Sequence, residues 1–410
     1  MQSGVKRLII VCDGMSDYPI KKLGNKTPLM IAKKPFMDKL ALEGVTGTFK
    51  TVPNDMPPGS EVANLSIIGY DPRENYCQRG VLEAASLGVK LASNDLAMRC
   101  NLIYVKGDKI ESHSGGDLEH EPAGKIIELL NKELGSKDIK FYQGFHYRHL
   151  LVVGGGSDKI KCYPPHDHVG EIYKNIMVQS DGDQGKVTAE ILNKLIMKSK
   201  DILEKLPSNI EKAKKDLKRP NLIWPWAQGH KPKMKTMKEL TGLNGATITA
   251  VDLIKGLSIY AGMDIIKVEG ATGNYKTNYE GKAQATLTAL EKYDYVYLHV
   301  EAPDEAGHDG DIDLKIRVIE DINNRLLAPI LKGIADKKID VRIALLPDHS
   351  TPVELRIHVK DAVPVLFWGS GIRPDGVKVF DELSVKEGSL KEMTQKDFFK
   401  SFLAPVQDQQ

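Results

Sequence analysis

Residues 7–13 read RLIIVCD, a run of five apolar side chains between an arginine and an aspartate. An unbroken apolar run of this length is typical of a strand that is buried on both faces of a parallel sheet. Ligands of such sheets gather at the carboxyl ends of the strands, which is where Asp13 stands. The stretch therefore predicts a central strand that ends at a functional edge.

Strands and helices are predicted to alternate in both the N-terminal and the C-terminal parts of the chain. Strands are expected at residues 45–52, 293–300, 341–346 and 362–369, and helices at residues 27–44 and 313–336. Alternating strands and helices predict an α/β fold, with a mostly parallel sheet flanked by helices and right-handed crossovers.

The length of the chain and a change of pattern predict two domains. The chain has 410 residues, more than one hydrophobic core usually serves. Its middle part is rich in short strands and polar loops, followed by lysine-rich helices. We therefore expect a catalytic domain of residues 1–76 and 219–410, and a smaller inserted α+β domain of residues 77–218. Residues 219–232, with Trp224 and Trp226, are expected to pack where the chain crosses between the domains.

Composition excludes several classes of protein. The net charge of +2 gives no reason to expect a nucleic-acid or membrane partner, and no apolar run approaches the roughly 18–20 residues of a membrane span. The four cysteines form no CxxC pair, which argues against a zinc ribbon or a disulfide framework. The apolar run near the N-terminus ends at once in aspartate, so we interpret it as a strand and not as a signal peptide, and we expect a cytoplasmic protein.

A second decisive stretch is PNDMPPGSEVANLSIIGYDP at residues 53–72. Prolines and a glycine lead into Ser60, which opens a short helix. The ordinary interpretation is a helix N-cap, since serine favours that position. The alternative is a nucleophile, because a helix N-terminus attracts anions and a serine there could accept a phosphoryl group if something activates it.

Carboxylates and imidazoles follow the predicted strands, and a metal ion bound by them could activate the serine. The candidates are Asp13, Ser60, Asp304, His308, Asp348, His349 and His358. Taken singly, an aspartate after a strand is often a helix cap, and Asp304 and His308 could simply share a helix face. Taken together, they are too many for one tetrahedral ion and suit two ions such as Zn²⁺ or Mn²⁺. A cation bound to the serine oxygen would make it nucleophilic.

Five motifs resemble a known family. VCDGMSDYP, PPGSEVANLSIIGYDP, RGVLEAASLGV, APDEAGHDGD and LLPDHSTP with RIHVKDAVPV, spread from residue 11 to residue 365, are similar to the archaeal-type cofactor-independent phosphoglycerate mutases of the alkaline phosphatase superfamily. The resemblance implies an alkaline-phosphatase-like fold. It also implies interconversion of 3-phosphoglycerate and 2-phosphoglycerate, without 2,3-bisphosphoglycerate, in glycolysis and gluconeogenesis.

The resemblance also implies residue roles. Ser60 would carry the phosphoryl group. Asp304, His308 and His358 would hold one metal ion, and Asp13, Ser60, Asp348 and His349 the other. Two Mn²⁺ ions are implied, with Mg²⁺, Zn²⁺ or Co²⁺ as substitutes.

The inserted domain is expected to act as a lid that binds the small-molecule substrate. Its candidate substrate contacts are Arg79 and Arg148 as a carboxylate clamp, with His113 and Asp117 as acid or base. Two alternatives stay open: a phosphatase or phosphotransferase of the same superfamily, such as a homoserine kinase-like enzyme, and a metal-binding protein without catalysis.

Overall fold

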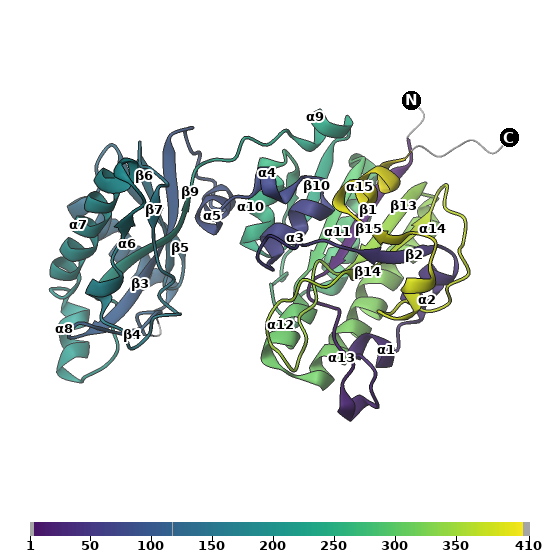
Figure 1. Ribbon diagram of the computed structural model, residues 1–410, viewed down its shortest axis with the longest axis horizontal. Coiled ribbons are helices and arrows are strands. Elements are labelled where there is room, and N and C mark those ends of the chain that lie inside the picture. Colours follow the sequence, from purple (N-terminus) through teal and green to yellow (C-terminus); the bar gives the residue numbers. More distant parts are fainter. Residues whose placement is uncertain (1–3, 117, 405–410) are drawn as a thin grey trace. The chain divides into compact units, whose positions relative to one another are not determined.

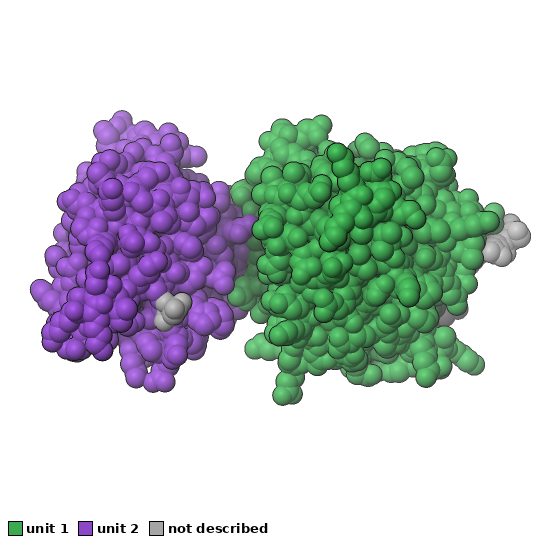
Figure 2. Space-filling view, turned by 90° about the horizontal axis from the view of Figure 1, so that it is seen from below, with its two compact units in different colours: residues 1–76, 234–410 green, residues 77–233 purple. Residues whose placement is uncertain are grey.

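The computed structural model describes residues 4–116 and 118–404, which fall into two compact units (Figures 1 and 2). Unit 1 joins residues 1–76 to residues 234–410, and unit 2 holds residues 77–233. The second boundary predicted from the sequence, at residue 218, is too early. Residues 222–229 form a strand, β9, that pairs with β3 inside unit 2, so this segment is not a crossing between domains.

Unit 1 is built on an eight-stranded sheet. From one edge to the other its strands are β11 (Asp264–Ile266), β10 (Gly245–Ile248), β12 (Tyr295–Val300), β1 (Lys6–Cys12), β13 (Val341–Leu346), β14 (Val363–Gly369), β2 (Val45–Phe49) and β15 (Lys391–Met393). Only β14 runs against its neighbours, so the sheet is mostly parallel, as expected.

Helices cover both faces of this sheet (Figure 1). Along β1, Leu8 and Ile10 point into one core, which they share with α2 (Pro35–Leu42), α11 (Tyr279–Lys292), α13 (Ile312–Asp321), η4 (Ile322–Leu327) and α14 (Ala328–Lys337). The opposite face carries α3 (Ser60–Ile67), α10 (Asp252–Tyr260) and α15 (Gln395–Leu403); there the rings of Phe49 and Phe398 stack 4.6 Å apart. Burial on both faces explains the unbroken apolar runs of the central strands.

The long helix predicted at residues 313–336 contains a π-helical segment, η4, between α13 and α14. Asn323 in this segment accepts hydrogen bonds from the backbone N–H groups of Phe36 and Met37, at the start of α2. Pro329 follows and lacks an N–H, so it cannot complete the regular α-helical bonding. The π-helical segment η4 is therefore linked to α2 through the side chain of Asn323.

Unit 2 is an α+β structure with its own core. Its main sheet is antiparallel and contains β4 (Lys109–Ser112), β3 (Asp95–Lys106), β6 (Arg148–Gly154), β5 (Ile139–Phe145) and β9 (Leu222–Gly229). The helices are α5 (Arg79–Ser86), α6 (His120–Leu134), α7 (Lys186–Leu203) and α8 (Pro207–Lys214), and β7 (Ile160–Lys161) pairs with β8 (Gln179–Ser180). Trp224 and Trp226 belong to the core of this unit.

The remaining elements are short. They are η1 (Lys21–Leu23), α1 (Pro28–Ile31), α4 (Pro72–Asn75), α9 (Met237–Thr241), α12 (Ala302–Asp309) and η5 (Ser384–Glu387) in unit 1, with η2 (Tyr173–Ile176) and η3 (Asp183–Gly185) in unit 2. Within the described part of the chain, every helix is too short or too polar to cross a membrane.

Candidate functional site

The ends of three adjacent strands deliver the predicted acidic residues to one edge of the unit 1 sheet. Asp13 follows β1, Asp348 follows β13, and Asp304 lies at the start of α12, directly after β12. Gly14 makes this convergence possible: its φ is +62°, and a Cβ there would lie 2.6 Å from the Cα of Asp304. Only glycine combines that backbone conformation with so close an approach.

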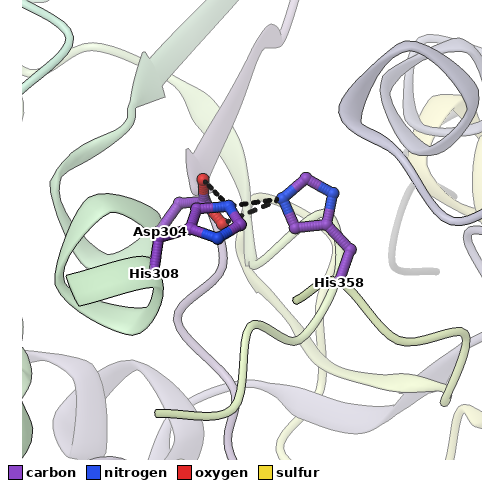
Figure 3. Close-up of side chains that lie close together, drawn as sticks. All are labelled: Asp304, His308 and His358. Atoms are coloured by element: carbon purple, nitrogen blue, oxygen red, sulfur yellow. Dashed lines mark hydrogen bonds and ion pairs between the residues drawn. The ribbon is translucent and has the colours of Figure 1, made fainter. Parts of the chain in front are cut away.

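Asp304, His308 and His358 form one group, called here the Asp304 cluster (Figure 3). Nε2 of His308 lies 3.2 Å from one oxygen of Asp304, Nε2 of His358 lies 3.4 Å from the other, and the two Nε2 atoms are 2.9 Å apart. Nδ1 of His308 lies 2.9 Å from the carbonyl oxygen of Arg356, to which it donates, and this leaves Nε2 as the ligand atom. The Asp304 cluster therefore has the donor set of a transition-metal site.

The charge state of His308 reflects this arrangement. Its hydrogen bond with the Asp304 carboxylate raises the pKa of His308 to about 9. Because metal ligands must give up their protons, protonation of His308 would compete with a cation bound by this cluster.

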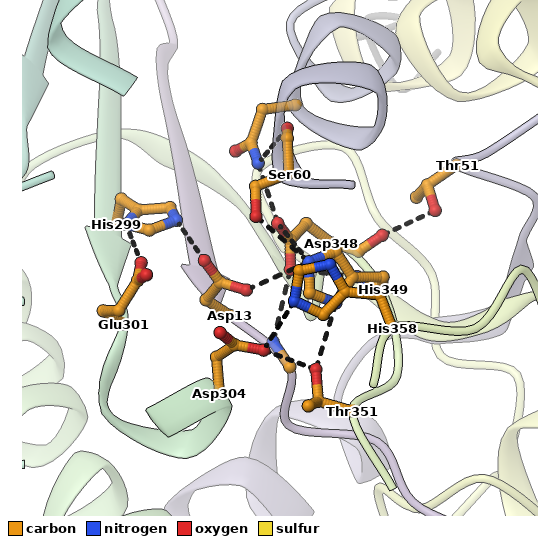
Figure 4. Close-up of polar contacts among 12 residues, drawn as sticks. Asp13, Thr51, Ser60, His299, Glu301, Asp304, Asp348, His349, Thr351 and His358 are labelled. Carbon is orange, nitrogen blue, oxygen red and sulfur yellow. Dashed lines mark hydrogen bonds and ion pairs between the residues drawn. The ribbon is translucent and has the colours of Figure 1, made fainter. Parts of the chain in front are cut away.

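Asp13, Asp348 and His349 form a second group, the Asp13 cluster, which is fully buried (Figure 4). Nε2 of His349 lies 3.4 Å from Asp13 Oδ1 and 3.5 Å from Asp348 Oδ2. Burial lowers the pKa of His349, which favours the neutral imidazole that a metal ion requires. Asn64 donates its side-chain N–H to Asp348 Oδ2 at 2.8 Å and so holds that carboxylate in place.

The carboxylate of Asp13 shows that the Asp13 cluster fits a cation. Within the described residues no donor is aligned for a hydrogen bond with either of its oxygens, although the side chain is fully buried. Burial, with the nearby carboxylate of Asp348, raises the pKa of Asp13 well above its ordinary value. The buried carboxylates of Asp13 and Asp348 both lie beside Nε2 of His349, and a positive charge between them would offset their repulsion. The acidic and histidine clusters of unit 1 therefore fit metal binding.

Ser60 faces the Asp13 cluster. It is the first residue of α3, Gly59 occupies the N-cap position, and no side chain caps this helix end. Oγ of Ser60 instead lies 3.1 Å from Nε2 of His349. The ordinary interpretation of Ser60 as an N-cap is therefore wrong, because its hydroxyl points to the buried cluster and not to the first turn of its own helix.

The polar residues of the site that were not among the sequence candidates include Thr351 and Asn64. The hydroxyl of Thr351 donates to Asp304 and lies 3.2 Å from Nδ1 of His349, so it joins the two clusters. Asn64 holds Asp348, as described above. Asn64 is four residues after Ser60, and that helical spacing is a signal that places both on one face of α3. Nothing in the local sequence marks Thr351.

The candidate substrate contacts lie in unit 2, and Asp117 lies outside the described residues. Arg79 is the first residue of α5. His113 and Arg148 share a neighbour, since the ring of Tyr147 lies 5.8 Å from the His113 ring and 5.7 Å from the Arg148 guanidinium. Burial, with His166 nearby, lowers the pKa of His113. The contacts of all four residues with a substrate stay predictions.

Comparisons with known proteins show which proteins this chain resembles. Residues 41–209 match a family model described as 2,3-bisphosphoglycerate-independent phosphoglycerate mutase. A relative of that name from Methanosarcina acetivorans is 46% identical over 388 residues, covering 94% of this chain and 96% of the relative.

Solved structures show the same fold. A protein from Pyrococcus horikoshii is 31% identical with a TM-score of 0.83, covering 99% of both chains. The cofactor-independent phosphoglycerate mutase from Thermoplasma acidophilum is 28% identical with a TM-score of 0.71, covering 97% of this chain and 99% of that one. Given a relative that is 46% identical over 94% of this chain, the chain belongs to the family of 2,3-bisphosphoglycerate-independent phosphoglycerate mutases.

Proposed function

We propose that the protein interconverts 3-phosphoglycerate and 2-phosphoglycerate, with Ser60 as the residue that carries the phosphoryl group between the two positions. The observation that supports this most is the setting of Ser60. Its hydroxyl is not used as a helix cap, lies at the N-terminus of α3, and stands 3.1 Å from His349 beside the buried carboxylates. A metal-binding protein without catalysis has no need of a serine in that place.

Two divalent cations are part of the proposal. The Asp304 cluster would hold one, and the Asp13 cluster together with Ser60 the other; their nitrogen and oxygen donors suit Mn²⁺, with Mg²⁺, Zn²⁺ or Co²⁺ as substitutes. When bound, such cations lower the pKa of a hydroxyl and neutralise the charge of phosphoryl oxygens.

The chain's own residues then account for the transfer. Oγ of Ser60 gives up its proton and forms a bond to the phosphorus as the bond from phosphorus to the substrate oxygen breaks, and that oxygen takes up a proton. The N-terminus of α3 favours the phosphoryl charge. The glycerate turns, and its other hydroxyl attacks the phosphoserine and releases Oγ. Because the phosphoryl group comes from the substrate itself, 2,3-bisphosphoglycerate is not required.

The inserted unit supplies the glycerate contacts in this proposal. Arg79 and Arg148 would clamp the carboxylate, and His113 and Asp117 would move the hydroxyl proton. Retention of the glycerate, with exclusion of water, is what separates a mutase from a phosphatase, and a lid is the ordinary way to achieve it.

One assay separates the alternatives. The protein, stripped of metal with a chelator and then given Mn²⁺, is incubated with 3-phosphoglycerate, and 2-phosphoglycerate and free phosphate are followed together. Formation of 2-phosphoglycerate with little free phosphate supports the proposal. Free phosphate without isomer would indicate a phosphatase, and turnover only with ATP and homoserine would indicate the kinase alternative.

The cytoplasmic location stays a prediction.

A further inference from the structure

We propose that His299 and Glu301 are positioning residues, which orient the Asp13 carboxylate so that one of its oxygens faces the cation. This inference rests on the proposed role of Asp13 as a metal ligand. His299 lies within β12, next to β1, and Glu301 follows at the end of that strand. Neither residue takes part in the phosphoryl transfer described above.

The two oxygens of Asp13 face different histidines (Figure 4). Oδ1 lies 3.4 Å from Nε2 of His349, inside the Asp13 cluster, while Oδ2 lies 3.1 Å from Nε2 of His299. Asp13 and His299 are both completely buried, so water does not compete for either group. An N–H on Nε2 directed at Oδ2 would hold that oxygen and leave Oδ1 for the cation.

The far side of the His299 ring faces a second carboxylate. Nδ1 of His299 lies 3.9 Å from Oε2 of Glu301, and neither ring nitrogen has an aligned hydrogen-bond partner among the described residues. Lys282, itself buried, donates to the carbonyl oxygen of His299 at 2.8 Å. The ring thus lies between two carboxylates, and its backbone carbonyl accepts a hydrogen bond from a lysine.

A third cation is the competing explanation, because ligand atoms of Asp13, His299 and Glu301 lie within 4.8 Å of one another. Two observations favour the positioning role. The two ring nitrogens face different carboxylates, and one imidazole offers a cation only one nitrogen at a time. The buried ammonium of Lys282, which donates to the carbonyl oxygen of His299, would also oppose a further positive charge in this space.

The test compares two polar substitutions of His299. Gln can place an N–H donor where Nε2 stands, whereas Asn ends one bond short of it. We expect His299→Asn to weaken Mn²⁺ binding at one of the two sites, the Asp13 cluster, about 10- to 100-fold, the usual effect of losing such a partner of a metal ligand. We expect His299→Gln to bind within a few-fold of the unmodified protein. Binding is measured by Mn²⁺ paramagnetic resonance without substrate.

The matched control is His149→Asn. His149 is a buried histidine of unit 2 and belongs to neither cluster. This variant should bind Mn²⁺ as the unmodified protein does. Equal affinity of the Asn and Gln variants of His299 and the unmodified protein would overturn the proposal. So would three bound cations that fall to two in both variants.

A measurement on the unmodified protein covers the case in which neither variant folds. In crystals grown with Mn²⁺, the anomalous signal should appear at the Asp13 and Asp304 clusters, with His299 Nε2 within hydrogen-bond distance of Asp13 Oδ2. A cation between Asp13, His299 and Glu301 would contradict the proposal. If the protein binds Mn²⁺ as expected but does not isomerise phosphoglycerate, the proposed function fails and the positioning role is still decided by these data.

Discussion

Ser60 and His349 are 289 residues apart in the sequence, yet Oγ of the serine lies 3.1 Å from Nε2 of the histidine. The serine comes from the start of α3, and the histidine from the loop after β13. The sheet brings them together because the loops that follow its parallel strands open on one edge. Their contact places an alcohol against a buried set of metal-type ligands.

The first prediction concerns Ser60. Ser60→Ala should lower the rate of conversion of 3-phosphoglycerate by at least about 10³-fold, because the variant has no oxygen to accept the phosphoryl group. The rate is measured with an enolase-coupled assay. Ser66→Ala is the matched control: Ser66 is a buried serine of the same helix, and its hydroxyl contacts only the backbone of Val62 among the described residues. Wild-type turnover by Ser60→Ala would remove the nucleophile assignment.

The second prediction concerns pH. The Asp304 carboxylate raises the pKa of His308 to about 9, so a proton competes with the cation at every pH below that value. Affinity of the Asp304 cluster for Mn²⁺ should therefore rise with pH, roughly tenfold per unit, and level off above about 9. Calorimetry in buffers of different ionisation enthalpy measures both the affinity and the proton released. An affinity that does not change between about pH 6 and pH 9 would contradict this account of the cluster.

How much of this site follows from the sequence differs from residue to residue. Asp13, Asp304 and Asp348 could be predicted, because each follows an apolar run that only a buried strand explains, and such strands end at a common edge. The roles of Thr351 and His299 could not be predicted from the sequence. Their roles depend on contacts between side chains from different strands, which the sequence does not show. A serine, threonine or histidine near a strand also has many ordinary structural roles.

The fold, like the site, could be predicted only in part from the sequence. The buried runs of β1, β12 and β13 predict a mostly parallel sheet, but the run at β14 gives no sign that this strand is antiparallel. Because of its prolines, the stretch around Trp224 and Trp226 is predicted to be a crossing between domains. It is a strand, since Pro225 and its neighbours pair with β3, a contact between distant segments that local composition does not reveal.

The third prediction concerns Thr351, which joins the two clusters. Thr351→Val keeps the shape of the side chain and removes the hydroxyl that donates to Asp304 and contacts His349. Mn²⁺ affinity should fall about 10- to 100-fold, as is usual when the partner of a metal ligand is lost. Equilibrium dialysis measures the affinity.

Thr286→Val is the control for Thr351→Val. Thr286 is also fully buried, but its hydroxyl donates to the backbone of its own helix, at Lys282. Unchanged Mn²⁺ binding by Thr351→Val, or an equal loss in both variants, would show that Thr351 does not support the ligands.

The fourth prediction concerns stability. The ammonium of Lys315 is completely buried and donates to the carboxylate of Asp17 at 2.8 Å, and to the backbone carbonyl oxygens of Ser16 and Thr351. It ties the loop after β1 to the loop after β13. Lys315→Met should lower the free energy of unfolding by about 3–5 kcal/mol, since it leaves a buried carboxylate without its partner.

Urea denaturation measures this loss, and a double variant tests its cause. Adding Asp17→Asn to Lys315→Met removes the stranded charge, so part of the stability should return. A double variant that is less stable than Lys315→Met alone would mean that the unpaired carboxylate is not the source of the loss.

The central claim is that Ser60 carries the phosphoryl group during the reaction, and trapping the phosphorylated chain tests it most directly. The Mn²⁺-loaded protein is mixed with 3-phosphoglycerate labelled in its phosphoryl group, quenched in acid within the first turnover, and digested for mass spectrometry. We predict label on the peptide that contains Ser60, formed at least as fast as 2-phosphoglycerate appears. Isomerisation at full rate with no label on Ser60 would contradict the account.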